Sequence, residues 1–217
     1  MYIPSDNFVD EEFTRGENIN WGDYGLDKKK AEDYLFEIFN SYEFPITIFR
    51  PTYIYGEENN LYRETYLFDR IVKGLSIPIP NSSTRTQFVH ISDLVRVFES
   101  TMYSEKTIGQ AYNLTHPEEV TWNGLVKAAM KVVNKKVDIK RVHKNLNIAS
   151  REYFPFRDVT YLLDIEKSIK DELYIPQINL NEGLEKAYKW YCEVKPSIED
   201  KRMDKVLYVL NIQEEIK

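Results

Sequence analysis

The sequence is poor in the residue types that define several large classes of protein. Its single cysteine, Cys192, cannot form a disulfide framework, and one reduced thiol is typical of a cytoplasmic protein. It has no apolar run of about eighteen residues, so we expect no membrane-spanning helix. The first residues, MYIPSDNFVDEE, lack the basic and apolar regions of a signal peptide, and we expect none. The three histidines show no metal-ligand spacing, so we expect no metal site.

Glycine is also scarce where one large class of nucleotide-binding proteins needs it. The eight glycines stand at positions 16, 22, 25, 56, 74, 109, 124 and 183. None of these spacings forms G-x-G-x-x-G or G-x-x-G-x-x-G, the turn that lets a dinucleotide pyrophosphate approach a helix N-terminus. These residues therefore contain no glycine-rich pyrophosphate turn.

What is present indicates a folded protein of moderate size. The 217 residues are 42% hydrophobic, enough for one domain with a core or for one domain and a smaller lobe. The net charge of −6 argues against a general nucleic-acid binder, and the only visible basic stripe is KVDIKRVHK at 136–144.

Alternating strand and helix patterns predict an α/β fold. Apolar spacing and capping residues predict helices, and β-branched or alternating stretches predict strands. The predicted strands are 1–4, the first half of 44–56, 87–92, 111–115 and 136–142. The predicted helices are 26–42, 60–74 closed by Gly74, 92–103 opened by Ser92 and Asp93, 121–134 capped by Thr121, 159–171 and 180–192. Residues 195–217 are predicted to be a peripheral helix or a mobile tail.

A tyrosine and a lysine stand one turn apart near the start of the first long helix. In DYGLDKKKAEDYL, residues 23–35, Tyr24 precedes Lys28 by four positions, which places both on one helix face. An ammonium close to a phenol favours the phenolate, and such a tyrosine can exchange a proton with a sugar hydroxyl or a ketone. The alternative for the pair alone is an amphipathic helix with a snorkelling lysine.

Further motifs stand on both sides of this pair in a fixed order. They are PSDNFVDEE before the tyrosine, then FRPTYIYGEEN, TRTQFVHISDL, AYNLT and FPFRDVTYLLDIEKS after the helix. In this order they resemble the extended short-chain dehydrogenase/reductase superfamily, the NAD-dependent epimerases, dehydratases and reductases of nucleotide sugars. The resemblance runs from residue 1 to about residue 192, and it implies a partial Rossmann-type parallel sheet with a smaller α/β substrate-binding lobe.

The resemblance assigns roles near the N-terminus. Tyr24 matches the catalytic tyrosine, and Lys28 matches the lysine that holds the nicotinamide ribose. Ser5 matches the serine or threonine that donates to the substrate oxygen, with a simple turn or cap as its alternative. Asp6 stands where the sugar dehydratases carry an acid, but Asn7 replaces the glutamate that follows there. This departure favours an epimerase or reductase over a standard dehydratase.

Later motifs contribute candidates for cofactor and substrate binding. Arg50 and Pro51 match the family's R-P pair, and Thr52 and Tyr53 would then face the nicotinamide and the sugar. The alternative is a strand that turns at Pro51 and packs its aromatic residues.

Two arginines are candidates for a substrate phosphate. The family's arginine stands two residues before the aromatic residue of its strand, where Thr86 stands here and Arg85 is one position earlier. Arg157 is the second candidate, and its alternative is a surface salt bridge. His90 and Asp93 match an element that is mainly structural, a strand end and a helix cap.

The glycine-rich half of such a fold precedes the tyrosine by several β-α units, whereas Tyr24 stands close to the start of this sequence. The chain is therefore expected to begin inside the catalytic strand of a larger fold, the N-terminal half being absent or carried by another chain. We expect residues 1–75 to be the end of the NAD(P)-binding domain, 76–192 mainly a substrate lobe, and 193–217 peripheral.

The expected function is the catalytic and substrate-binding portion of an NAD- or NADP-dependent nucleotide-sugar epimerase, dehydratase or reductase, inactive by itself. A bare N-terminal strand edge would favour self-association. The alternative is a non-catalytic binding or regulatory protein of the same descent, including RNA-binding relatives. The residues Ser5, Tyr24 and Lys28 favour descent from an enzyme.

Overall fold

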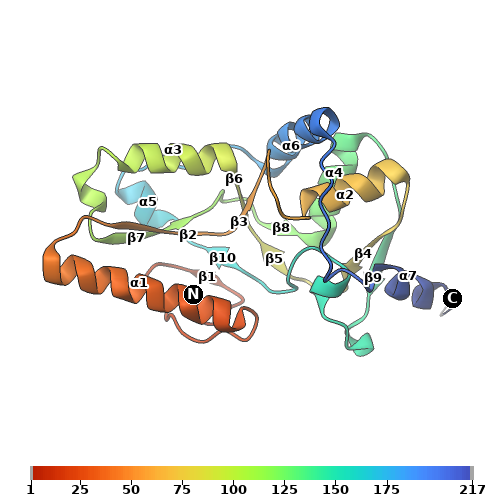
Figure 1. Cartoon of the computed structure of the whole chain (residues 1–217), viewed down its shortest axis with the longest axis horizontal. Coiled ribbons are helices and arrows are strands. Elements are labelled where there is room, and N and C mark those ends of the chain that lie inside the picture. The colour runs from red at the N-terminus through yellow and green to blue at the C-terminus, as the bar shows by residue number, and fades with distance from the viewer. Residues whose placement is uncertain (1, 216–217) are drawn as a thin grey trace. The chain divides into compact units, whose positions relative to one another are not determined.

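The computed structural model describes residues 2–215, with the backbone alone for 213–215, and forms two compact units (Figure 1). Unit 1 comprises residues 1–54, 86–119 and 160–178, and unit 2 comprises residues 55–85, 120–159 and 179–217. Both units combine helices with strands, so the predicted α/β class is confirmed.

The helices are α1 Gly22–Tyr42, α2 Glu64–Lys73, α3 Ile91–Thr101, α4 Trp122–Val133, α5 Glu166–Lys170, α6 Leu180–Val194 and α7 Val206–Glu215. The strands are β1 Phe8–Val9, β2 Thr47–Pro51, β3 Tyr53–Tyr55, β4 Ile77–Pro80, β5 Arg85–Thr86, β6 Phe88–His90, β7 Gln110–Leu114, β8 Val120–Thr121, β9 Ile139–Val142 and β10 Leu162–Leu163.

Unit 1 is built on the parallel pair of β2 and β7, which runs in register from Thr47 opposite Gln110 to Pro51 opposite Leu114. Side chains of a strand alternate between its two faces. Phe49 packs on Phe98 of α3, with ring centroids 5.1 Å apart, and the next residue, Arg50, contacts α1. Figure 1 accordingly shows α1 and α3 on opposite sides of this pair.

The turn between α1 and β2 positions the long helix against the sheet. Helix α1 ends where Glu43 adopts a left-handed conformation, with φ of 55°, and donates its N–H to the Phe39 carbonyl. Gly109, just before β7, has a φ of 73° and donates to the Ile46 carbonyl. A Cβ at Gly109 would lie 2.4 Å from the Phe39 ring, so both the conformation and the space require glycine there.

Unit 2 is built on the parallel pair of β4 and β9, with α2, α4 and α6 packed together (Figure 1). Its core is aromatic: Trp122 stacks on Phe156 at 5.2 Å and meets Phe154 edge-on at 5.4 Å. As predicted, Thr121 caps α4 by accepting the Gly124 N–H, and Gly74 closes α2 with a φ of 71°.

Several sequence predictions need correction. Residues 2–4 form no strand, because Tyr2 makes only a single bridge with Arg15, and Met1 lies outside the described residues. Helix α2 begins at Glu64, later than the predicted start at position 60.

The helix predicted at 92–103 begins one position earlier and has a different cap. The His90 side chain, and not Ser92 or Asp93, caps α3 by accepting the Ser92 N–H. The helix predicted at 159–171 is limited to the short helix α5, because residues 162–163 form strand β10, which pairs in parallel with β1. Within 195–217 the predicted helix is confirmed only for α7, whose Val206 and Val209 are buried. Residues 195–205 form no helix, and residues 216–217 lie outside the described residues.

The compact units do not follow the continuous ranges 1–75, 76–192 and 193–217. Each unit is assembled from three separate segments because the chain returns repeatedly to both strand pairs. The three ranges remain a prediction about which residues bind cofactor and substrate. Among the described residues, no helix is both long and apolar enough to span a membrane.

Candidate active site

A cavity of about 430 Å³ lies in unit 1 between α1 and β2, within the size range of small-molecule sites. Helix α1 contributes the side chains at successive turns of one face, and β2 contributes its last four residues. The lining residues are Tyr2, Tyr24, Lys28, Ala31, Glu32, Leu35, Ile48, Phe49, Arg50, Pro51 and Tyr161.

Tyr24 and Lys28 face this cavity together. The Lys28 ammonium nitrogen lies 5.7 Å from the centroid of the Tyr24 ring, within the range of a cation–π contact. Tyr24 is 58% exposed, so its hydroxyl is accessible to a ligand. The helix predicted over 26–42 is confirmed by α1, which begins earlier, at Gly22, and the i, i+4 spacing does place both groups on one face.

In the same cavity lining as Tyr24 and Lys28, a buried ion pair joins helix α1 to strand β2. The Arg50 guanidinium donates to the Glu32 carboxylate through Nη2 at 2.5 Å and Nε at 3.2 Å. The two side chains are only 11% and 9% exposed. Arg15 adds a second guanidinium 3.2 Å from Glu32, so two cations surround one buried carboxylate.

Arg50 also fixes the N-terminal segment. It donates through Nη1 to the Tyr2 hydroxyl at 2.5 Å and to the Glu11 carbonyl at 2.8 Å. The Tyr2 hydroxyl in turn donates to Asn113 of β7 at 2.7 Å. Burial raises the pKa of Tyr2 to about 12, although Arg50 acts in the opposite direction. Tyr2 therefore stays a neutral structural hydrogen-bonding group.

A buried carboxylate belongs to the same region. Glu11 accepts the Asn113 backbone N–H at 2.7 Å and is 9% exposed. Burial raises the pKa of Glu11, and the Asn113 hydrogen bond opposes this only in part. Asn113 also donates to the Val9 carbonyl at 2.9 Å, so both Val9 of β1 and Glu11 are held to β7.

Ser5 and Asp6 lie in the turn that leads to β1. The Ser5 hydroxyl accepts the Asn7 N–H at 3.1 Å and lies 3.2 Å from the Asn7 carbonyl, a local turn arrangement. Asp6 is exposed. Neither residue lines the cavity that contains Tyr24 and Lys28, and their catalytic roles remain predictions.

The residues after Arg50 differ in their access to the cavity. Pro51 lines it. Thr52 is buried, and its hydroxyl shares a hydrogen bond of 2.7 Å with Thr115. Tyr53 is also buried and packs on Phe88, with ring centroids 5.6 Å apart. Tyr53 therefore makes the aromatic packing that the alternative describes, and its contact with the sugar remains a prediction.

The two candidate phosphate-binding arginines belong to unit 2. Arg85 is exposed, and Arg157 is half-buried. Their flanking segments meet at Asp158, whose Oδ1 accepts hydroxyl hydrogen bonds from Ser82 at 2.5 Å and Thr84 at 2.7 Å. Among the described residues, no group of three or more His, Cys, Asp or Glu side chains is arranged to hold a metal ion.

Glu32, Arg15 and Tyr2 were not predicted as part of the site. Glu32 follows Tyr24 and Lys28 at the same helical spacing, so the helical period places it on the cavity face. That spacing was the available signal, but a glutamate on an amphipathic helix is usually solvated. Its arginine partners, Arg15 and Arg50, lie outside α1 on either side of it in the sequence, and no local pattern joins them to Glu32.

Comparison with known proteins finds a family whose model matches this sequence. The model of the NAD dependent epimerase/dehydratase family matches residues 2–115, about half of the chain. A curated relative, the chloroplast stem-loop binding protein of 41 kDa b of Arabidopsis thaliana, is 33% identical over 146 residues. That match covers 65% of this chain and 38% of the relative.

Solved structures show the same fold. UDP-glucose 4-epimerase from Thermotoga maritima superposes with a TM-score of 0.71 at 19% identity, covering 88% of this chain and 60% of that one. UDP-glucuronic acid 4-epimerase from Bacillus cereus, solved with UDP-glucuronic acid and NAD, gives a TM-score of 0.68 at 20% identity, covering 88% and 58%. The chain thus spans about 60% of these structures and less than half of the curated relative. With the ordered motifs, the parallel strands and the Tyr24–Lys28 pair, the family match establishes that this chain belongs to the NAD-dependent epimerase/dehydratase family.

Proposed function

We propose that this chain is the catalytic and substrate-binding portion of an NAD(P)-dependent enzyme that acts on a nucleotide sugar. The observation that carries the proposal is the Tyr24–Lys28 pair, which faces a cavity of about 430 Å³ with the ammonium 5.7 Å from the phenol ring. The solved relatives bound to UDP-glucose and to UDP-glucuronic acid support the substrate class.

In this proposal Tyr24 exchanges a proton with a hydroxyl or ketone oxygen of the sugar. Lys28 stabilises the phenolate by its charge and binds the ribose next to the nicotinamide. Ser5 donates to the same substrate oxygen, and Asp6 and Tyr53 contact the sugar. Arg85 and Arg157 hold phosphate oxygens of the nucleotide.

The residues present fit one end of the cofactor. Tyr24, Lys28 and Pro51 line a cavity that can receive the nicotinamide and its ribose, whereas a glycine-rich turn for the pyrophosphate is missing from the sequence. The bound nicotinamide supplies or accepts a hydride. We therefore propose that the isolated chain binds NAD or NADP weakly or not at all. A micromolar affinity measured by calorimetry would contradict this part of the proposal.

The central test is Tyr24→Phe in a complete protein that adds the glycine-rich half to this chain. Phenylalanine keeps the ring and removes only the proton-transferring group, so turnover should fall about 10²–10⁴-fold with little change in stability. Tyr34→Phe is the matched control, because Tyr34 is 61% exposed on the same helix and does not line the cavity. Unchanged turnover in Tyr24→Phe would refute the mechanism.

Asp6→Asn distinguishes the reaction types. A dehydratase should lose most of its activity, because elimination of water requires an acid at that position. An epimerase or reductase should lose much less, which is the result we expect because Asn7 replaces the partner carboxylate. A near-complete loss would assign the protein to the dehydratases.

A second candidate function is binding without catalysis. It is favoured by the curated relative, which is named as a stem-loop binding protein. The net charge of −6 argues against a generally basic surface. Self-association through the N-terminal segment also remains a prediction, and sedimentation at high concentration would test it.

A further inference from the structure

Basic residues are concentrated in one segment of this acidic chain. Residues 127–144, KAAMKVVNKKVDIKRVHK, contain seven lysines and arginines and a single acidic residue, Asp138. This segment carries a formal charge of +6, although the whole chain carries −6. The remaining residues therefore carry a formal charge of −12, so positive charge is concentrated in residues 127–144 and is not spread over the chain.

The fold gathers part of this segment around a second cavity. An opening of about 630 Å³ in unit 2 is lined by Lys127, Lys131, Lys135 and Lys136 together with apolar residues of α4 and the start of β9. Among the residues whose side chains the structure describes, no carboxylate lines it. Lys127 and Lys131 are one turn apart on α4, so their ammonium groups extend from the same face. All four lysines are exposed, and among the described residues none of them forms an ion pair.

Intramolecular roles account for only part of the cluster. Lys135 donates to the Val72 carbonyl at 2.6 Å, near the C-terminal end of α2. Lys131 lies in the last turn of α4, where a cation stabilises the helix dipole. Lys127 lies in the middle of α4 and Lys136 lies beyond its end, so neither position is explained by the dipole. Mutual repulsion of these charges is a cost that an anionic ligand would remove.

We propose that this lysine-lined cavity binds the phosphate backbone of RNA. Lysine ammonium groups without carboxylate partners are the side chains that bind backbone phosphates without reading the bases. Lys140, Arg141 and Lys144 continue the basic segment beyond the cavity, although Lys140 lies 3.7 Å from Asp138 and Lys144 lies 4.0 Å from Asp158. A basic segment of this length suits an extended polyanion better than a single phosphate group. The relative named for stem-loop binding supports RNA as the polyanion. The inference is independent of the proposed hydride transfer, because none of these residues belongs to the Tyr24 cavity.

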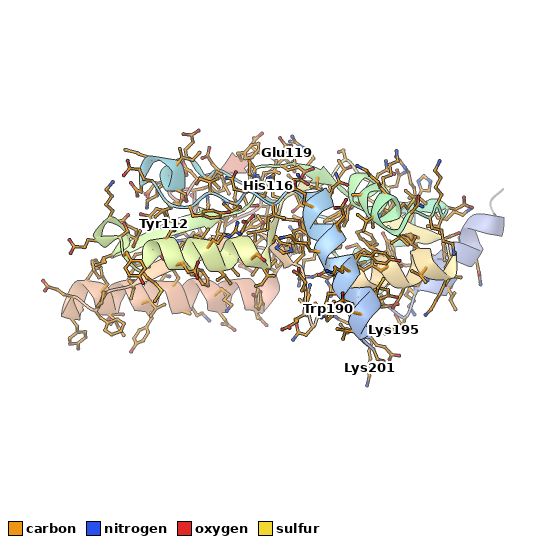
Figure 2. All side chains as sticks on the ribbon, turned by 90° about the horizontal axis from the view of Figure 1, so that it is seen from above. Tyr112, His116, Glu119, Trp190, Lys195 and Lys201 are labelled. Atoms are coloured by element: carbon orange, nitrogen blue, oxygen red, sulfur yellow. The ribbon has the colours of Figure 1, made fainter. Side chains whose placement is uncertain are left out.

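The test is fluorescence anisotropy with a labelled RNA stem-loop, titrated with the chain at several salt concentrations. The variant is Lys127→Gln/Lys131→Gln/Lys136→Gln, which keeps Lys135 and its bond to Val72. The control is Lys186→Gln/Lys189→Gln/Lys201→Gln. It removes the same charge from two positions of α6 and from Lys201, which follows α6 in the sequence and is labelled in Figure 2. Circular dichroism and thermal melts verify that both variants fold.

The variant should bind at least about tenfold more weakly at low salt than the unmodified chain, since each phosphate contact contributes to the salt-dependent affinity. The slope of log affinity against log salt should decrease by about three, one for each lost contact. The control should keep most of the affinity and slope.

Three results would overturn the proposal. The first is that the unmodified chain does not bind the stem-loop at about 50 mM salt, where phosphate contacts are strong. The second is an equal loss in the variant and the control, which would indicate a general charge effect. The third is binding of vesicles containing anionic lipid, but not of RNA, through the same three lysines.

Discussion

The buried pair of Arg50 and Glu32 should be a main determinant of the stability of unit 1. Replacing Glu32 by glutamine keeps the size and helix preference of the side chain and removes its charge. Arg50 would then be 11% exposed without its ion-pair partner, although the Tyr2 hydroxyl and the Glu11 carbonyl would remain as acceptors. Removing one partner of a buried pair costs about 3–5 kcal/mol. Because these acceptors remain, we expect Glu32→Gln to lower the free energy of unfolding by about 3 kcal/mol, near the lower end of this range.

The measurement is urea unfolding followed by circular dichroism, together with native-state hydrogen exchange of the α1 amides. Exchange locates the effect, because a loss of about 3 kcal/mol should speed up opening of the most protected α1 amides about 100-fold. Using both methods also avoids assuming a single two-state transition in a chain with two compact units.

Asp27→Asn is the matched control for Glu32→Gln. It makes the same acid-to-amide change on the same helix, in a pair with Lys30 whose side chains are 71% and 66% exposed. This change should cost less than about 1 kcal/mol. If Glu32→Gln cost no more than Asp27→Asn, the buried pair would not hold α1 to β2 as proposed.

Three further outcomes are expected. Gly183→Ala should lower the melting temperature, although alanine normally favours a helix, because its Cβ would lie 2.1 Å from the Tyr55 hydroxyl oxygen; a rise would contradict this packing. Thr121→Ala should lower the free energy of unfolding by about 1 kcal/mol through the lost α4 cap, and an unchanged value in urea unfolding would show that the cap contributes nothing. Glu11→Gln should change the pH dependence of stability: since burial raises the pKa of Glu11 above 4.5 in the folded state, the native protein binds the proton more tightly and loses stability as pH rises through that raised pKa. The variant should therefore gain stability relative to the unmodified chain as the pH rises from 4.5 through that raised pKa. A loss of stability relative to the unmodified chain over this pH range would contradict the prediction.

Local patterns predicted the elements that depend on local causes. The spacing of apolar residues and of Tyr24 and Lys28 predicted α1, and the β-branched run after Pro45 predicted β2. The caps at Thr121 and Gly74 were also readable, because each depends on residues within a few positions.

The remaining errors concern partners that are distant in the sequence. Residues 2–4 had the composition of a strand, but a strand needs a neighbour, and the Tyr2 side chain is instead held by Arg50 and Asn113. The predicted helix at 159–171 lost its first part because Leu162 and Leu163 pair with β1, which lies near the start of the chain. The Arg50–Glu32 pair was missed for the same reason, since neither residue shows its burial in its own surroundings.

The discontinuous composition of the two units limits how this chain can be divided in the laboratory. The backbone passes from one unit to the other five times, so a cut at any single peptide bond within residues 55–178 leaves each fragment with incomplete parts of both. Expression of either half alone should give aggregation-prone material, because strand pairs such as β2 with β7 would lose a partner that is distant in the sequence. Such distant pairings also slow folding from the unfolded chain, because long loops must close before the contacts form. Limited proteolysis of the native protein should consequently release no stable core, and the nicked fragments should stay associated until denaturant is added.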